Sequence, residues 1–352
     1  MRIKQLNPLK RKLLRPFRNL LTSDIEQQSK ALTQLPQSIL ITRLNHRLGN
    51  QLLITPLIED LIAHFPNCSI DLVVQGQMAE QINRANPNVA DYIVMPRKPF
   101  KELGVYLKTW LKIRRKKYDL AINVTASSTS GRLAAKLSKS KLQLMGDEFQ
   151  QQYAETPLAQ HLAVQPVYNL RAWLASVNWA KNIPLPSLKL HLTAAEKAHG
   201  VDLIKKLNPT HKQRVVALYT FATDIKCYEP RFWQPVYEQL KANHPDIHFI
   251  EILPVENISQ LTDPELIQFY SKDIREIAAL MQQCELIVVA DSGMMHLATA
   301  SQTPTLGLFK NPYHHKYTPY GGKNGSLLVR DHEPEVLVNY LAKHLGQENS
   351  QK

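Results

Sequence analysis

Short apolar runs alternate with longer amphipathic segments along most of the chain, and this alternation is the feature that most limits its fold. The runs typical of buried strands are residues 38–43, 69–74, 91–96, 119–124 and 141–146, then 215–220, 248–253, 286–291 and 304–309. The segments between them carry apolar residues at helical spacing, as in Leu48 to His64. Strands that alternate with helices form parallel sheets covered on both faces, so the sequence predicts an α/β fold of doubly wound sheets.

The alternation weakens between residues 150 and 195, where prolines flank one expected helix at about 168–181. A chain of 352 residues also exceeds what one compact core typically organises. The expected organisation is a basic segment at 1–30, a Rossmann-like domain at 31–165, a connection at 166–195 and a second Rossmann-like domain at 196–352. Ligands of open α/β sheets bind beyond the carboxyl ends of strands, which predicts a site in a central cleft between the domains. The loops expected to line it follow residues 43, 220, 253 and 291.

The formal net charge of +13 is concentrated in two places. Residues 1–20 contain seven Lys or Arg and no acid, and residues 97–117 contain nine basic residues and one acid, Glu102. The first segment lacks the uninterrupted apolar stretch of a secretory signal. Two interpretations of it stay open: an amphipathic segment attracted to anionic lipid, or a solvated, disordered tail. No stretch approaches the ~20 apolar residues of a membrane span.

The three cysteines, Cys68, Cys227 and Cys284, lie far apart and form no CxxC pair. This pattern favours a reducing compartment and argues against a zinc or disulfide framework. The positive charge permits a nucleic-acid partner, but no helix-turn-helix, zinc or aromatic RNA-binding signature accompanies it. We therefore expect neither a metal nor a nucleic acid.

The strongest local pattern is residues 286–309, LIVVADSGMMHLATASQTPTLGLF. A buried strand ends at Asp291, and Ser292-Gly293 begins a helix whose first N–H groups and positive dipole end attract phosphate. Gly293 allows close approach of the backbone, the Ser292 hydroxyl can donate a hydrogen bond, and His296 lies one turn along. The alternative is a helix N-cap with a buried histidine.

A second pattern is residues 218–233, LYTFATDIKCYEPRFW. Thr220 and Thr223 follow a strand end, and Lys226 can bring a compact positive charge to a leaving phosphate. A surface lysine in a polar loop is the alternative.

A third pattern is the turn between the first strand and its helix, which contains Arg43, Asn45, His46, Arg47, Gly49 and Asn50. Gly49 permits a tight turn. The N–H groups after it can receive a sugar or phosphate oxygen.

Together these segments resemble glycosyltransferase family 9, the heptosyltransferases that build the inner core of bacterial lipopolysaccharide. The amino-terminal pattern of the family matches Arg43, residues 48–52 and Thr55-Pro56, and its Thr-rich loop is similar to residues 220–230. Its D-(S/T)-G-x-x-H-L segment, the most specific part, is similar to residues 291–297, and a T-P strand follows at 303–309. The resemblance runs from about residue 38 to 345.

The resemblance implies a GT-B fold, with the acceptor on the amino-terminal half and the nucleotide-sugar on the carboxy-terminal half. It implies inverting, metal-independent transfer of a heptose or related sugar from an ADP-sugar, without a cofactor. The acceptor would be a lipopolysaccharide core or a related lipid-linked glycan. Such an enzyme would work in the cytoplasm of a Gram-negative bacterium, peripheral to the anionic surface of the inner membrane.

The resemblance also assigns roles to residues. The donor-binding residues would be Thr220, Thr223, Lys226, Glu256, Asp291, Ser292, Gly293, Met294 and His296. Among these, Lys226 and the turn at 292–294 would hold the diphosphate, Asp291 and His296 would lie near the transferred sugar, and Glu256 would contact the ribose. The acceptor side would comprise Arg43, Gly49 and Asn50, with the basic residues of 97–117 facing anionic groups, and the catalytic residues would be Asn50, His46 and Lys226.

Asn50 departs from the family pattern, because the family keeps at this place an aspartate thought to deprotonate the acceptor. An amide cannot act as a general base. Either His46 takes the proton, or Asn50 only orients the acceptor while a donor phosphate oxygen accepts it; His46 as a solvent bystander is the alternative to its role. Lys226 is followed by Cys-Tyr-Glu-Pro, which indicates a one-residue insertion in its loop. A catalytically silent sugar-nucleotide or glycan-binding protein of the same fold is the alternative to an enzyme.

Overall fold

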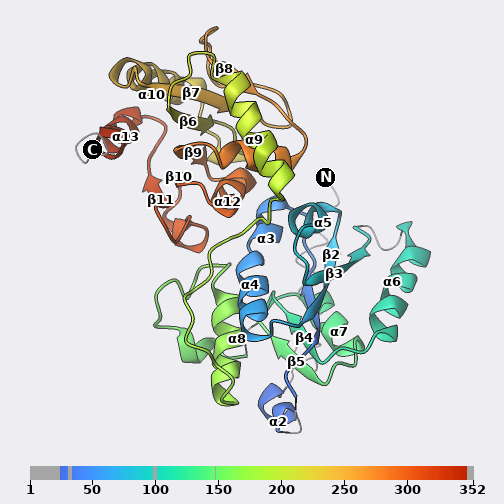
Figure 1. Cartoon of the computed structure of the whole chain (residues 1–352). Helices are drawn as coiled ribbons and strands as arrows, with labels where there is room; N and C mark the ends of the chain where they lie inside the picture. Colours follow the sequence, from blue (N-terminus) through green and yellow to red (C-terminus); the bar gives the residue numbers. More distant parts are fainter. Residues whose placement is uncertain (1–23, 31–33, 98–100, 147, 347–352) are drawn as a thin grey trace. The chain divides into compact units, whose positions relative to one another are not determined.

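The computed structural model describes residues 24–30, 34–97, 101–146 and 148–346, and these divide into two compact units at Pro186/Ser187 (Figure 1). The basic segment 1–20 lies outside the described residues. Each unit is built on its own parallel sheet with helices on both faces, which confirms the α/β prediction. None of the described helices is long and apolar enough to cross a membrane.

The first unit holds a five-stranded sheet in the order β3-β2-β1-β4-β5. Its strands are β1 (Ser38–Arg43), β2 (Ser69–Gln75), β3 (Val89–Met95), β4 (Leu120–Asn123) and β5 (Leu142–Met145). Its helices are α2 (Ile25–Ser29), α3 (Leu48–Leu52), α4 (Thr55–His64), α5 (Met78–Asn83), α6 (Leu103–Arg115), α7 (Thr129–Leu137), the 3-10 helix η2 (Gln150–Tyr153) and α8 (Gln165–Ser176). β1 pairs in parallel with both β2 and β4, so the order in which the chain adds strands reverses at the β1–β4 junction, the switch point of the sheet.

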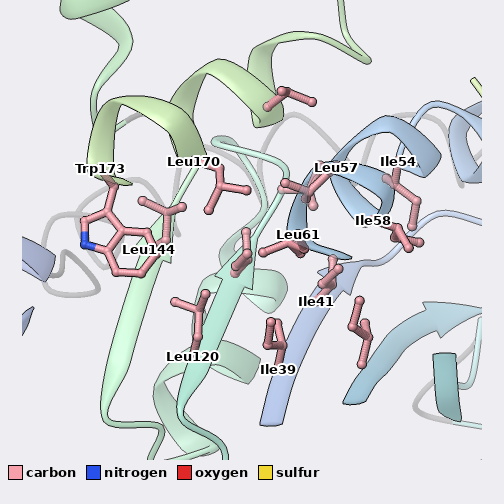
Figure 2. Packing of buried hydrophobic residues seen from close by; sticks show 14 of the residues in the cluster. Ile39, Ile41, Ile54, Leu57, Ile58, Leu61, Leu120, Leu144, Leu170 and Trp173 are labelled. Carbon is pink, nitrogen blue, oxygen red and sulfur yellow. The ribbon is translucent and has the colours of Figure 1, made fainter. Parts of the chain in front are cut away.

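Two apolar layers cover this sheet. On one face, Leu57 and Leu61 of α4 and Leu170 and Trp173 of α8 pack over β1, β4 and β5 (Figure 2). On the other face, Ile113 of α6 and Ala134 of α7 pack against the central strands. Because both faces are buried, the strands read as continuous apolar runs, which is why their positions could be predicted.

The segment expected as one helix, residues 48–64, forms two helices that break at Leu53-Ile54. Pro56 lies in the first turn of α4, and a proline there removes a helical N–H and crowds the carbonyl of Leu52. The Thr55 hydroxyl donates to that carbonyl at 2.8 Å, which satisfies the acceptor that the break exposes. Gly49 lies inside α3, so the prediction of a tight turn at Gly49 was wrong. Residues 44–47 instead form the connection between β1 and the helix.

Two short helices belong to the core of the first unit although the sequence placed them in flanking segments. α8 falls in the expected connection 166–195, yet Trp173 is fully buried in the core. α2 falls in the expected basic segment, yet Ile25 is buried and the Trp173 indole N–H donates to the Ser29 hydroxyl at 2.9 Å.

The second unit holds a six-stranded sheet in the order β11-β10-β9-β6-β7-β8. Its strands are β6 (Arg214–Tyr219), β7 (Ile247–Ile252), β8 (Ile267–Phe269), β9 (Leu286–Ala290), β10 (Thr305–Phe309) and β11 (Gly325–Leu328). Its helices are α9 (Ala194–Leu207), α10 (Pro230–Asn243), α11 (Ile274–Met281), α12 (Gly293–Ala300) and α13 (Pro334–Gly346), with the 3-10 helices η3 (Asp224–Lys226) and η4 (Pro312–Lys316). This strand order is that of a dinucleotide-binding Rossmann sheet, and β6 and β9 meet at its switch point.

Three elements of the second unit were not expected from the sequence. β8 and β11 are short edge strands with little apolar signal. α9 begins with a capping box between Thr193 and Glu196, a signal that was present in the sequence. Gly200 lets α9 approach α11 closely, because a side chain there would collide with the backbone of Ala279.

Candidate active site

Residues from two strand ends of the second sheet meet at Asp291. This residue follows β9, and its Oδ2 lies 2.7 Å from the Nζ of Lys226, which ends η3 in the loop after β6. Because β6 and β9 are neighbours, their carboxyl ends carry both loops to the same edge of the sheet. Two motifs found separately in the sequence thus form one ion pair, and the Lys226 side chain remains 48% exposed.

The loop that carries Lys226 is held in place by contacts of Lys310 and Tyr228. The Lys310 ammonium donates to the carbonyl of Cys227 at 2.8 Å and to Asp331 Oδ1 at 2.6 Å. Tyr228 is fully buried, its ring lies 4.5 Å from the same ammonium, and its hydroxyl donates to the carbonyl of Val329. The Cys-Tyr-Glu-Pro segment is therefore an anchor that holds Lys226 at the edge of the sheet.

Tyr317 borders this pair and was missed by sequence reasoning. Its ring centroid lies 5.8 Å from the Lys226 Nζ and 6.3 Å from the ring of His296, so Tyr317 is a neighbour of both residues. Tyr317 follows η4 in the loop after β10. A signal was available, because β10 pairs with β9 and its following loop must reach the same edge.

The turn before α12 presents polar groups at this edge. Ser292 is the N-cap of α12 with an extended backbone, but its side chain makes no capping bond. Its Oγ is buried and finds no hydrogen-bond partner among the described residues. Buried polar groups in native proteins are nearly always paired, and the first N–H groups of a helix also lack helical acceptors. An unpartnered hydroxyl thus lies next to the first N–H groups of α12, which begin at Gly293, and donors of both kinds are suited to an anion.

Two further residues expected at the donor site lie in α12 itself. Met294 and His296 are buried, with 9% and 6% of their surfaces exposed. Both belong to the first turns of the helix, next to the Ser292 cap.

The two threonines after β6 differ. Thr220 is buried, and its hydroxyl donates to Glu251 Oε1 at 2.7 Å, so it ties β6 to β7. Thr223 is exposed at the start of η3, with no capping bond from its side chain. Of the two, Thr223 is placed to reach a ligand beside Lys226.

A buried carboxylate supports the neighbouring loop. Glu251 is fully buried in β7 and also accepts a short hydrogen bond from Ser259. Burial raises the pKa of Glu251, against the hydrogen bonds from Ser259 and Thr220 that lower it. Glu256, in the same loop, is exposed, and its charge adds to the burial that raises the pKa of Tyr219.

In the first unit, Arg43 at the end of β1 connects helix α3 to the loop after β4 at the switch point. Its Nη2 donates to Asn50 Oδ1 at 2.8 Å, its Nε donates to the Asn50 carbonyl at 3.3 Å, and its Nη1 donates to Thr125 Oγ1 at 2.6 Å. A guanidinium only donates, so the Asn50 amide oxygen is the acceptor and the amide nitrogen is its remaining polar group. Thr125, in the loop after β4, was not foreseen; the β1–β4 pairing places it there.

His46 lies in the exposed loop before α3 and contacts Arg97. Its Nε2 is 3.1 Å from Arg97 Nη2. Desolvation first, and then the charges of Arg97 and Arg47, lower the pKa of His46. The ring is therefore neutral near pH 7, with its Nε2 lone pair accepting from the guanidinium. The sequence pattern marks Arg97 only as one of the basic residues 97–117.

Comparison with known proteins gives the family. The model of glycosyltransferase family 9 (heptosyltransferase) matches residues 106–339, two thirds of the chain. A glycosyl transferase family 9 structure from Veillonella parvula superposes with a TM-score of 0.67 at 17% identity, covering 88% of this chain and 89% of its own. None of the curated protein sequences matches the chain.

Two Escherichia coli structures give the same result. ADP-heptose lps heptosyltransferase II superposes with a TM-score of 0.60 at 16% identity, covering 89% of this chain and 99% of its own. Heptosyltransferase WaaC with ADP superposes with a TM-score of 0.57 at 17% identity, covering 90% and 98%. The chain belongs to glycosyltransferase family 9 and is a glycosyltransferase built from two Rossmann-like domains of the GT-B type.

Proposed function

We propose that this glycosyltransferase transfers a heptose or a related sugar from an ADP-sugar to a lipopolysaccharide core or a related lipid-linked glycan, with inversion and without a metal or other cofactor. The observation that carries the proposal is the Lys226–Asp291 pair beside the unpartnered Ser292 hydroxyl at the start of α12. A cation, a hydroxyl and helix N–H groups together match the oxygens of a diphosphate. Heptosyltransferase WaaC of Escherichia coli, which has this fold, has been solved with ADP and with ADP-2-deoxy-2-fluoro heptose.

The donor-site residues have separate roles in the transfer reaction. The acceptor oxygen bonds to the anomeric carbon while the bond from that carbon to the diphosphate breaks, and the nucleoside diphosphate leaves with the electron pair. Lys226 and the α12 terminus offset the negative charge that develops on the leaving phosphate, the role that a metal ion plays in other transferases. Asp291 holds the Lys226 ammonium at 2.7 Å and so orients it before the donor arrives.

The residues on the acceptor side position the acceptor hydroxyl and do not deprotonate it. Asn50 gives its amide oxygen to Arg43, which leaves its NH₂ group to donate to the acceptor hydroxyl oxygen. His46 already uses its Nε2 toward Arg97. Of the two routes for the acceptor proton, these contacts favour transfer to a phosphate oxygen of the donor, with Asn50 orienting the acceptor.

A lipid-linked acceptor would determine where in the cell the enzyme works. We place the enzyme in the cytoplasm of a Gram-negative bacterium, peripheral to the anionic inner-membrane surface. The basic residues 97–117 support this placement, because each Lys or Arg near an anionic leaflet adds attraction.

A transfer assay tests the proposal. Purified protein is mixed with ADP-heptose and with lipopolysaccharide that lacks inner-core heptose, and the product is read by mass spectrometry beside a UDP-sugar and a GDP-sugar control. The expected result is addition of one heptose, lost in Lys226→Ala and kept in the matched surface variant Lys343→Ala, which changes an exposed lysine of α13. Transfer from UDP-sugar alone would contradict the donor assignment.

A further inference from the structure

Helix α6 carries two apolar stripes, and only one of them packs against the protein. The inner stripe consists of the buried Ile113 and the half-buried Tyr106 and Trp110, which pack against the core of the first unit. The outer stripe consists of Leu103, Leu107 and Leu111, whose side chains are 56%, 55% and 51% exposed. Residues four apart lie on the same side of a helix, so these leucines form a continuous exposed line. Figure 1 shows α6 at the outer side of the first unit, beside β3.

Cations border the leucine line. Lys108, Lys112 and Arg115 follow the adjacent side of α6 at helical spacing, and Arg114 lies on the leucine side. Lys112 pairs with Asp91 and Lys116 with Asp71, whereas no described residue forms an ion pair with Lys108, Arg114 or Arg115. The helix itself contains no acid, so positive charge exceeds negative charge along this face.

A hollow of about 790 Å³ is lined by residues of α6 together with residues of β2 and β3. Ile93, Leu111 and Tyr118 give it an apolar wall, and Lys108, Lys112, Arg115 and Lys116 line it as cations. Asp71 and Asp91 also line it, but each is bound to a lysine. Its volume falls in the range of about 300–1,000 Å³ that small ligands fill.

We propose that α6 is the membrane-docking element of this protein, with Leu103, Leu107 and Leu111 entering the interfacial layer of an anionic bilayer. Lys108, Arg114 and Arg115 contact lipid phosphates, and the hollow receives one headgroup. An exposed leucine line flanked by unpaired cations matches the chemistry of an anionic lipid surface, which offers apolar chains below a layer of negative charge. The inference deepens the proposed function by naming the surface through which a lipid-linked acceptor is approached.

Vesicle co-sedimentation of the full chain tests it. Vesicles of phosphatidylglycerol with phosphatidylethanolamine are compared with pure phosphatidylcholine, at two salt concentrations. The native protein is expected to bind the anionic vesicles and to release at high salt. Lys108→Gln with Arg115→Gln should weaken binding by about fivefold for each charge removed. Lys205→Gln with Lys206→Gln, an equal charge change on exposed α9 residues, should not.

The apolar contribution needs its own variant. Leu107→Ser with Leu111→Ser should lose vesicle binding, while Leu133→Ser with Val201→Ser, which changes two exposed apolar residues elsewhere, should keep it. Urea unfolding and ADP binding confirm that each variant is folded. Equal vesicle binding by the native chain and both α6 variants would overturn the inference, as would failure of the native chain to bind anionic vesicles. A native dimer that becomes monomeric in the leucine variant, with vesicle binding unchanged, would instead identify a protein interface. Loss of transfer activity with vesicle binding intact would count only against the proposed function.

Discussion

The Lys226 ammonium lies 2.7 Å from the Asp291 carboxylate, and this pair unites two loops separated by 65 positions in the chain. Both loops leave the carboxyl edge of one sheet, where β6 and β9 run side by side. The ammonium is anchored at one oxygen and still half exposed, so a diphosphate at the start of α12 can compete for it.

We predict that the Ser292 hydroxyl strengthens ADP binding and lowers the stability of the folded protein. Ser292→Ala removes a buried, unpartnered Oγ, so the variant should be as stable as the native protein or more stable by up to about 1 kcal/mol in urea unfolding. ADP binding should weaken several-fold. Ser301→Ala is the matched control: its Oγ donates to the Ala298 carbonyl at 2.8 Å, and its loss should lower stability by about 1 kcal/mol without affecting ADP. A marked loss of stability in Ser292→Ala would show that the hydroxyl has a structural partner.

Asn50→Asp should raise turnover. The substitution places a carboxylate next to Arg43 and in reach of the acceptor, and general-base catalysis typically contributes about 10²–10⁴-fold. Because the Arg43 charge makes that carboxylate a weaker base, we expect an increase in kcat of about tenfold. Asn45→Asp introduces the same charge in the loop before α3 and should leave kcat unchanged. An unaltered kcat in Asn50→Asp would mean that a carboxylate at this position does not reach the acceptor hydroxyl, which would contradict the role of Asn50 in orienting the acceptor.

The pH profile distinguishes His46 from the donor phosphate as proton acceptor. A basic His46 would make kcat/KM rise with pH through its pKa, which lies below its ordinary value of 6.5. Arg97→Ala removes a positive charge that lowers this pKa, so that inflection would then move to higher pH. We predict that His46→Ala changes kcat/KM by less than about twofold and removes no inflection, since Nε2 is engaged by Arg97. An inflection that disappears in His46→Ala and moves upward in Arg97→Ala would contradict the phosphate route.

Glu251 should make stability depend on pH. Its folded-state pKa is raised by burial, so the folded protein holds this proton more tightly than the unfolded chain does. The contribution of Glu251 to the free energy of unfolding is therefore fully present below the ordinary carboxyl pKa of 4.5. It is lost as the pH rises through the folded-state pKa. Glu251→Gln keeps an acceptor for Thr220 but cannot ionise. Urea titrations from acid to neutral pH should show a loss of stability in the native protein that is smaller in Glu251→Gln; identical slopes would contradict this account.

Much of the fold followed from the sequence because buried parallel strands are apolar on both faces. The same logic placed Lys226 and Asp291 at strand ends, and neighbouring strands then had to bring them together. Gly49 was misread because glycine signals a turn in general, whereas Pro56, seven residues later, carries the actual break. Helix α8 was assigned to a connection because prolines flank it, although Trp173 fills the core.

Contacts between side chains at the edges of the sheets could not be predicted. The His46–Arg97 contact spans 51 positions and depends on the path of two irregular segments. The Arg43–Asn50 contact likewise depends on side-chain direction, which residue spacing does not give. Tyr317 belongs to a loop with no motif, and only the β9–β10 pairing explains its place.

Calorimetry with nucleotides tests the donor site most directly. ADP, UDP and GDP are titrated into the native protein, Lys226→Ala and the control Lys343→Ala. We predict that ADP binds best, that Lys226→Ala weakens ADP binding by about 10-fold or more through the lost charge-assisted contact, and that Lys343→Ala binds ADP as the native protein does. Equal ADP binding by the native protein and Lys226→Ala, or no preference for ADP over UDP and GDP, would contradict it.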